Sequence, residues 1–219
     1  MKTSIDFFDT QFRSQSPDAA LKLNPFEESA LPYLRGDVLE FGCGMGNLAF
    51  AAATHGCRVT ALDGSPAAVD HVRARAAAQS AQVSTAVADL RTYVLSAEYD
   101  SVVAIGLLMF FDCPTAFKIL ADLQRHVRPG GHAVVNVLVK GTTYLDMFEQ
   151  ESHCLFEPSD LESRFADWDI KLSEQSRFAA PGGTEKCFST VIARKPLAQP
   201  RAGAYPSRER TLGMQRDTR

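Results

Sequence analysis

Three glycines at positions 42, 44 and 46 are the residues of this sequence best placed for binding chemistry. They lie in V-L-E-F-G-C-G-M-G-N, residues 38–47, between an apolar run and a small-residue helical stretch. Glycine lets the backbone turn tightly and approach a ligand where a Cβ atom would intrude. The free N–H groups of the following helix suit an anionic group such as a carboxylate. Asn47 stands where the dinucleotide motif G-x-G-x-x-G requires its third glycine, so the spacing here is G-x-G-x-G.

Three further sequence features follow the glycines in the order that a nucleoside ligand requires. Asp63 ends the second apolar run, where a carboxylate can accept both hydroxyls of a ribose. Asp89 and Leu90 follow the third run, where they would bind an adenine amino group and cover its ring. Ile105 and Gly106 end the fourth run, beside the point where open α/β sheets bind ligands. Each aspartate has an alternative interpretation as a turn or capping carboxylate, but the ordered set predicts a nucleoside-binding site.

The elements that must position these residues alternate between short strands and helices. Strands are predicted over residues 38–41, 57–62, 82–87, 101–105 and 133–139, and helices over 47–55, from 66 onward and over 114–127. Ser65 is the expected N-cap of the second helix, and Pro129-Gly130-Gly131 the stop of the third. This alternation predicts an α/β fold with a parallel, doubly wound sheet. Alternating residues at 168–172 and the run 188–193, on either side of Pro181-Gly182-Gly183, predict a C-terminal antiparallel hairpin.

Residues 38–139 resemble a class I S-adenosylmethionine-dependent methyltransferase, and L-Q-R-H-V-R-P-G-G-H-A-V-V, residues 123–135, is also typical of that superfamily. The resemblance implies a Rossmann-like, seven-stranded sheet that is mostly parallel with an antiparallel C-terminal hairpin. It also implies S-adenosylmethionine as the cofactor and a small molecule as the methyl acceptor. The implied cofactor-binding residues are Glu40, Phe41, Gly42, Cys43, Gly44, Gly46, Asn47, Asp63, Gly64, Ser65, Asp89, Leu90, Ile105 and Gly106.

A narrower resemblance concerns the C-terminal half. L-L-M-F-F after the fourth strand, F-A-D-W-D-I before the hairpin and F-S-T-V-I-A-R-K-P at its end are similar to the tellurite-resistance methyltransferase family. That family methylates chalcogen oxyanions and related small nucleophiles and carries a His-Arg pair ahead of its last hairpin. Here Ser176 stands in place of the histidine before Arg177. Arg177 and Tyr144 are the candidate catalytic residues, with His153 and Lys186 as further pocket candidates. A solvated surface position is the alternative for each of them.

Aromatic residues are concentrated in two places beside the expected site. Phe110 and Phe111 follow the fourth strand, where an aromatic face would favour the cationic sulfonium. The N-terminal aromatic residues, which include Phe8 and Phe12, would either form a lid over the cofactor or pack in the core. We expect residues 1–36 to form a helical lid segment, residues 37–195 the methyltransferase domain and residues 196–219 a disordered tail.

Composition excludes several other classes of function. The chain has 219 residues and a formal net charge of −3, which argues against nucleic acid as a partner. It lacks an apolar run long enough to span a membrane, and its first residues do not resemble a signal peptide. Five scattered cysteines indicate neither a disulfide framework nor a metal site and suit a reducing compartment, with most of them buried. We therefore expect a cytoplasmic monomer or homodimer without a metal.

Three alternatives stay open from the sequence. The acceptor could be a natural product or metabolite that is methylated on oxygen or nitrogen. A nicotinamide-dependent oxidoreductase is disfavoured by Asn47 and by the lack of an obvious Tyr-Lys pair. A non-catalytic module would keep the cofactor site without turnover.

Overall fold

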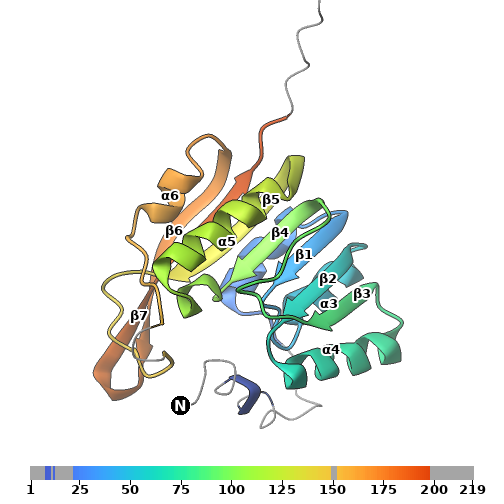
Figure 1. The fold of residues 1–219 in the computed structure, drawn as a ribbon, viewed down its shortest axis with the longest axis horizontal. Coiled ribbons are helices and arrows are strands. Elements are labelled where there is room, and N and C mark those ends of the chain that lie inside the picture. Colours follow the sequence, from blue (N-terminus) through green and yellow to red (C-terminus); the bar gives the residue numbers. More distant parts are fainter. Residues whose placement is uncertain (1–7, 11, 13–21, 149–151, 198–219) are drawn as a thin grey trace, which may run out of the picture.

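A computed structural model describes residues 8–10, 12, 22–148 and 152–197 of the chain, which form one mixed sheet with helices on both faces (Figure 1). The strand order is β3-β2-β1-β4-β5-β7-β6, with the first five of these parallel and with β7 antiparallel to both β5 and β6. The strands are β1 (Asp37–Phe41), β2 (Arg58–Asp63), β3 (Val83–Val87), β4 (Tyr99–Ile105), β5 (Val127–Leu138), β6 (Asp169–Ala180) and β7 (Thr184–Arg194). The predicted α/β class, the mostly parallel sheet and its antiparallel C-terminal hairpin are confirmed.

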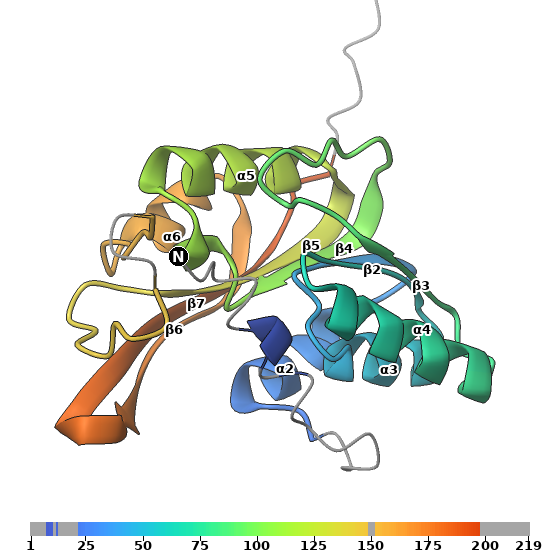
Figure 2. The ribbon, with the colours of Figure 1, turned by 60° about the horizontal axis from the view of Figure 1, so that its bottom comes forward.

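Two layers of helices cover the two faces of the sheet, as Figure 2 shows. On one face lie α2 (Pro25–Ala30), the 3₁₀ turn η1 (Leu31–Tyr33), α3 (Asn47–Thr54) and α4 (Pro66–Gln79). On the other face lie α5 (Cys113–Arg125) and α6 (Asp160–Arg164). Burial of both faces explains the nearly continuous apolar runs of β4 and β5.

Local sequence signals fix where the helices beside the sheet edge begin. The Ser65 hydroxyl caps α4 by accepting the Ala68 N–H, and Pro66 is the first helical residue, as predicted. The Asp112 carboxylate caps α5 by accepting the Thr115 N–H at 2.9 Å, so that helix starts one residue before the predicted Pro114. These caps orient both helix starts toward the carboxyl ends of the parallel strands.

The prediction that Pro129-Gly130-Gly131 stops a helix is wrong, because these residues lie inside β5. The α5 helix ends at Arg125, and β5 begins only two residues later. Gly130 donates its N–H to the Lys195 carbonyl, and Lys195 donates its N–H to the Gly131 carbonyl. The start of β5 is therefore hydrogen-bonded to the residue that follows β7. The turn at residues 181–183 is confirmed, although the strands on either side of it are about twice as long as predicted.

A disulfide joins Cys113 and Cys154, which corrects the prediction that the cysteines form no disulfide. Their separation of 41 residues carries no spacing signal, and the fold brings them together where α5 starts beside the segment that follows β5. The Cys154 N–H donates to the Met109 carbonyl at 3.0 Å and fixes the same contact. The other cysteines, Cys43, Cys57 and Cys187, are unpaired and buried, as predicted for most of the cysteines.

Parts of the predicted segments lie outside the described residues: 1–7, 11 and 13–21 of the lid segment, and 198–219 of the tail. Within the part of the chain that the structure describes, no helix is long and apolar enough to cross a membrane. The same part holds no group of three or more His, Cys, Asp or Glu side chains arranged for a metal ion.

Candidate active site

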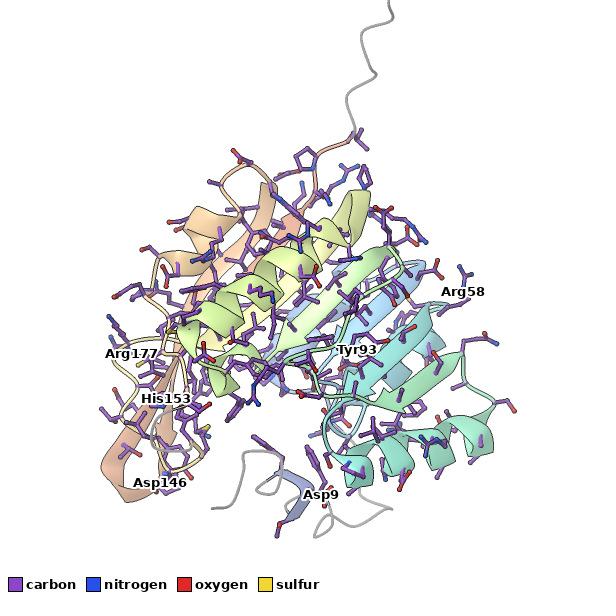
Figure 3. All side chains as sticks on the ribbon, in the orientation of Figure 1. Asp9, Arg58, Tyr93, Asp146, His153 and Arg177 are labelled. Carbon is purple, nitrogen blue, oxygen red and sulfur yellow. A yellow bond between two sulfur atoms is a disulfide. The ribbon has the colours of Figure 1, made fainter. Side chains whose placement is uncertain are left out.

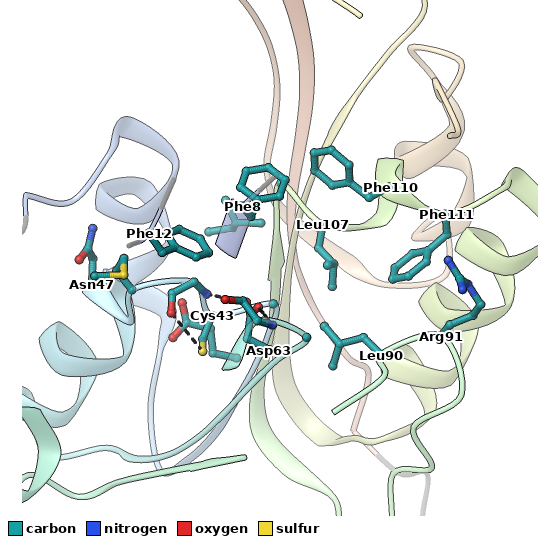
Figure 4. A pocket seen from close by; sticks show the side chains of 18 of the residues that line it. Phe8, Phe12, Cys43, Asn47, Asp63, Leu90, Arg91, Leu107, Phe110 and Phe111 are labelled. Atoms are coloured by element: carbon teal, nitrogen blue, oxygen red, sulfur yellow. Dashed lines mark hydrogen bonds between the residues drawn. The ribbon is translucent and has the colours of Figure 1, made fainter. Parts of the chain in front are cut away.

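A pocket of about 560 Å³ opens at the carboxyl ends of the parallel strands (Figure 4). It lies where the strand order reverses between β1 and β4, the position at which open α/β sheets bind ligands. Its wall consists of Phe8, Phe12, Asn24, Glu27, Glu40, Gly42, Cys43, Gly44, Met45, Asn47, Asp63, Gly64, Ser65, Asp89, Leu90, Arg91, Ile105, Gly106, Leu107, Phe110, Phe111 and Ser152.

The glycine loop between β1 and α3 has a backbone that only glycine adopts readily. Gly42 has φ +86°, and a Cβ there would lie 3.0 Å from the Leu107 side chain across the pocket. Gly44 has φ +49°, and a Cβ there would lie 3.3 Å from the Phe12 ring. A side chain at either position would therefore enter the space between the loop and its neighbours. The loop exposes backbone to the pocket, as the sequence indicates.

Asp63 at the end of β2 holds the loop and faces the same pocket. Its Oδ2 accepts the Gly44 N–H at 2.8 Å, and its Oδ1 accepts the Ser65 N–H at 2.8 Å. Burial raises the pKa of this carboxyl, and the N–H donors of Ser65, Gly44 and Gly64 oppose that rise. Each carboxylate oxygen has a second lone pair. Asp63 can therefore accept two hydroxyl groups of a ribose without giving up its backbone partners.

Glu40 on β1 is a buried acid without an adequate partner. Its side chain is 6% exposed, and its Oε2 atom has no hydrogen-bond partner among the described residues. Burial raises the pKa of Glu40 well above its usual value, and the nearby charges of Glu27 and Asp63 raise it further. A buried acceptor without a donor is costly. A cationic donor in the pocket, such as an ammonium group, would satisfy it.

The opposite end of the pocket is a slot between apolar side chains. Leu90 and Leu107 lie there with Phe111 and the Arg91 guanidinium (Figure 4). Asp89 also lines the pocket, and its Oδ1 accepts the Arg91 N–H at 3.0 Å, so this carboxylate shapes the turn as well. A flat heterocycle fits such a slot, because both of its faces contact apolar atoms and its edge meets a carboxylate.

The described part of the N-terminal segment closes the pocket from the outside. The Phe8 ring meets Phe110 edge-on with 5.1 Å between ring centroids, and it stacks on Phe12 at 5.9 Å. Asp9 fixes the segment to the start of α4, because its Oδ1 accepts the Ser65 hydroxyl at 2.7 Å and the Ala67 N–H at 3.0 Å. The aromatic segment therefore covers the pocket rather than a distant part of the core.

All of the predicted cofactor-binding residues except Phe41 and Gly46 line this one pocket. Phe41 is buried in the core beneath the sheet edge, and Gly46 is the N-cap of α3 with φ +72°. The pocket residues that the sequence analysis did not identify are Asn24, Glu27, Met45, Arg91 and Ser152, and Phe8 and Phe12, predicted as lid or core residues, also line the pocket. One signal for Glu27 was present: Asn24 and Glu27 are spaced as a capping box, which predicts the start of α2.

The candidate acceptor residues Arg177, Tyr144, His153 and Lys186 do not line this pocket, and their role in acceptor binding stays a prediction. Arg177 lies on the hairpin, and its side chain is 76% exposed. Its guanidinium nitrogen Nη1 lies 3.8 Å from Oε2 of Glu185. The Lys186 ammonium lies over the Tyr144 ring at 4.7 Å, and His153 stacks on Phe148. Arg177 and Lys186 lie on the β6–β7 hairpin, whereas Tyr144 and His153 lie between β5 and α6. Figure 3 shows Arg177 and His153 on the same side of the molecule.

Comparisons with known proteins agree with this geometry. A family model described as "Methyltransferase domain" matches residues 38–131. The matched segment contains the glycine loop, Asp63 and the first strands of the pocket, so this part of the chain is similar to the methyltransferase domain that the model describes. S-adenosylmethionine is the cofactor of such domains, and the glycine loop, Asp63 and the unpartnered Glu40 fit its amino-acid and ribose parts.

Three known proteins illustrate the similarity. "Hemagglutinin 1" of Eikenella corrodens is 29% identical over 72% of this chain and 54% of its own length. The probable S-adenosyl-L-methionine-dependent methyltransferase TehB of Haemophilus influenzae is 24% identical over 72% of this chain and 57% of its own length. The TehB crystal structure superposes with a TM-score of 0.70 at 18% identity, covering 88% of this chain and 67% of that chain.

The N-methyltransferase NodS from Bradyrhizobium japonicum, in complex with S-adenosyl-L-homocysteine, superposes with a TM-score of 0.66 at 18% identity. That match covers 89% of this chain and 99% of NodS. The chain spans little more than half the length of the two relatives that it matches in sequence. The predicted resemblance to class I methyltransferases, including the TehB-like family, is confirmed.

Proposed function

We propose that this protein transfers a methyl group from S-adenosylmethionine to a small-molecule acceptor. One observation carries the proposal: Glu40, whose Oε2 atom has no partner among the described residues, lies in the same pocket as the glycine loop and Asp63, at the reversal of strand order. When bound, the cofactor supplies a methyl group on a sulfonium, which is a cationic electrophile with a good leaving group.

The residues of the chain bind and align the reactants in this proposal. Asp63 holds the ribose, Glu40 holds the ammonium, and Leu90 with Leu107 encloses the adenine ring. Phe8 and Phe110 meet over the pocket, so they exclude water and offer aromatic faces to a cation. Alignment of two reactants in one closed site contributes about 7–11 kcal/mol to such displacements. In this proposal residues 8–10 and Phe12 act as part of the lid.

The acceptor class follows from the charge of the pocket wall. The resemblance to the tellurite-resistance family favours a chalcogen oxyanion or a thiol-like nucleophile. The described residues of the wall, however, include four carboxylates, Glu27, Glu40, Asp63 and Asp89, and a single cation, Arg91. In this proposal the carboxylates bind the cofactor, which carries a single net positive charge at neutral pH, so the wall stays net negative when the cofactor is bound. An oxyanion is disfavoured by that remaining charge, whereas an amine can enter and react as the neutral base. We therefore propose that the acceptor is an amine or an uncharged thiol-like group rather than an oxyanion. Amines of metabolites and natural products belong to this class.

Calorimetric titration with S-adenosyl-L-homocysteine, with NADH in parallel, tests the cofactor assignment. We expect micromolar binding of the former alone, and preference for NADH would overturn the assignment. A second assay follows the formation of S-adenosyl-L-homocysteine with panels of amines, thiols, phenols, selenite and tellurite. Turnover with amines or thiols supports the proposed class, and turnover with the oxyanions alone refutes it. Cofactor binding without turnover on any panel would indicate a non-catalytic module.

A further inference from the structure

Two carboxylates from different parts of the chain face the same side of the pocket. Glu40 comes from β1, within the segment that matches the methyltransferase domain, and Glu27 comes from α2, which precedes that segment. Both carboxylates line the pocket, and Glu27 is the charge that raises the pKa of Glu40 most after burial. Burial raises the pKa of Glu27 itself, against the opposing Asn24 N–H.

The described residues do not supply a cation to this pair. Arg91 is the one cationic side chain among the described wall residues, and it lies beside Phe111, at the far side of the pocket from Asn47 and Cys43 (Figure 4). Glu40 raises the pKa of the Cys43 thiol, which places Glu40 at the Cys43 side. The Asn47 side chain donates to the Lys22 carbonyl, just ahead of α2, so α2 lies at that side as well.

A buried carboxylate beside a half-buried one is stabilised by a proton or a cation between them. An ammonium group is the matching partner, because it carries a positive charge and three N–H donors. Glu27 has already used one lone pair of Oε2 for the Asn24 N–H at 2.7 Å, and Glu40 keeps Oε2 without a partner. The pair therefore retains acceptor sites for more than one N–H of the same ammonium.

We propose that Glu27 is the second carboxylate of the site that holds the amino-acid ammonium of the cofactor. This inference rests on the proposed function, since it assumes an S-adenosylmethionine site. The short α2 helix then completes the cofactor site from outside residues 38–131, and its capping box fixes the Glu27 carboxylate at the start of α2, where it lines the pocket. The N-terminal part of the chain thereby contributes charge to cofactor binding as well as aromatic cover.

The test compares two ligands and two matched variants of the full chain by calorimetry. S-adenosyl-L-homocysteine carries the amino-acid group, and 5′-methylthioadenosine carries the same nucleoside thioether without it. Glu27→Gln removes the charge and keeps the capping box, since glutamine also serves at that position. Glu28→Gln, at the exposed neighbouring position on α2, is the control for helix charge.

We expect Glu27→Gln to weaken S-adenosyl-L-homocysteine binding about tenfold or more and to leave 5′-methylthioadenosine within about twofold. Glu28→Gln should leave both affinities unchanged. An equal loss of affinity for both ligands would overturn the inference, because Glu27 would then act only through local structure. Stronger binding of S-adenosyl-L-homocysteine would also overturn it, because Glu27 would then face the carboxylate of the ligand. Failure of the unaltered protein to bind S-adenosyl-L-homocysteine would instead refute the proposed function itself.

Discussion

Replacement of Asp63 by alanine removes a carboxylate that does two things at once. Its oxygens hold the Gly44 and Ser65 N–H groups at 2.8 Å each, and in the proposed function they also accept the ribose hydroxyls. Asp63→Ala should therefore weaken cofactor binding strongly and loosen the glycine loop. The two effects differ in size, and the structure indicates which one is larger.

The loss of binding should exceed the loss of stability. Losing hydrogen bonds from the ribose to a charged acceptor costs about 1–3 kcal/mol, or about 5- to 150-fold in affinity. The folded protein without cofactor loses two backbone hydrogen bonds, but it also loses a half-buried carboxylate, whose charged form is disfavoured by burial, the cause that raises its pKa. These terms oppose each other, so we expect a net stability change of about 1 kcal/mol, equivalent to about 2–4 °C in the melting temperature.

The assay is calorimetric titration of Asp63→Ala with S-adenosyl-L-homocysteine, with a thermal melt of the same preparation. Asp70→Ala is the matched control, because Asp70 lies on α4 with its side chain 70% exposed and pairs only locally with Arg73. Binding of the control should equal that of the unaltered protein. If folded Asp63→Ala binds S-adenosyl-L-homocysteine within about twofold of the unaltered protein, the ribose assignment is refuted.

Three further predictions test the lid, the disulfide and a buried histidine. Asp9→Ala removes the acceptor for Ser65 at the start of α4, so stopped-flow dissociation of S-adenosyl-L-homocysteine should become faster, and an unchanged rate would argue against a lid. Cys113→Ser opens a link to Cys154 across 41 residues, which should lower the free energy of unfolding by about 4 kcal/mol in urea titrations under oxidising conditions, with no difference from the unaltered protein after reduction. Burial, aided by nearby arginines, lowers the pKa of His132 to about 4, so the folded state resists protonation. Stability should therefore be lost as the pH falls from about 6.5 toward 4, and His132→Gln should flatten that part of the melting-temperature profile.

Features that depend on a short stretch of chain were predictable from the sequence. The glycine loop, the acid that ends β2 and the Ser65 cap each follow from local backbone geometry, and strand and helix alternation then specifies a parallel sheet. Because the carboxyl ends of parallel strands meet at one edge, the order of the motifs also indicates that they share a pocket. The boundaries were less predictable, as the Pro129-Gly130-Gly131 segment inside β5 shows.

Contacts between distant segments were decided by the tertiary structure. Cys113 is bonded to Cys154, and Glu27 lines the same pocket as Glu40, because packing brings their elements together, while spacing along the chain carries no information about either pair. Arg177 illustrates the converse: its residue type suits an anionic substrate, but two long strands carry it away from the pocket. A side chain's chemistry is local, whereas its partners are set by the packing of the two faces of the sheet. The sequence by itself therefore determined the class of ligand, and the fold determined which charges surround it.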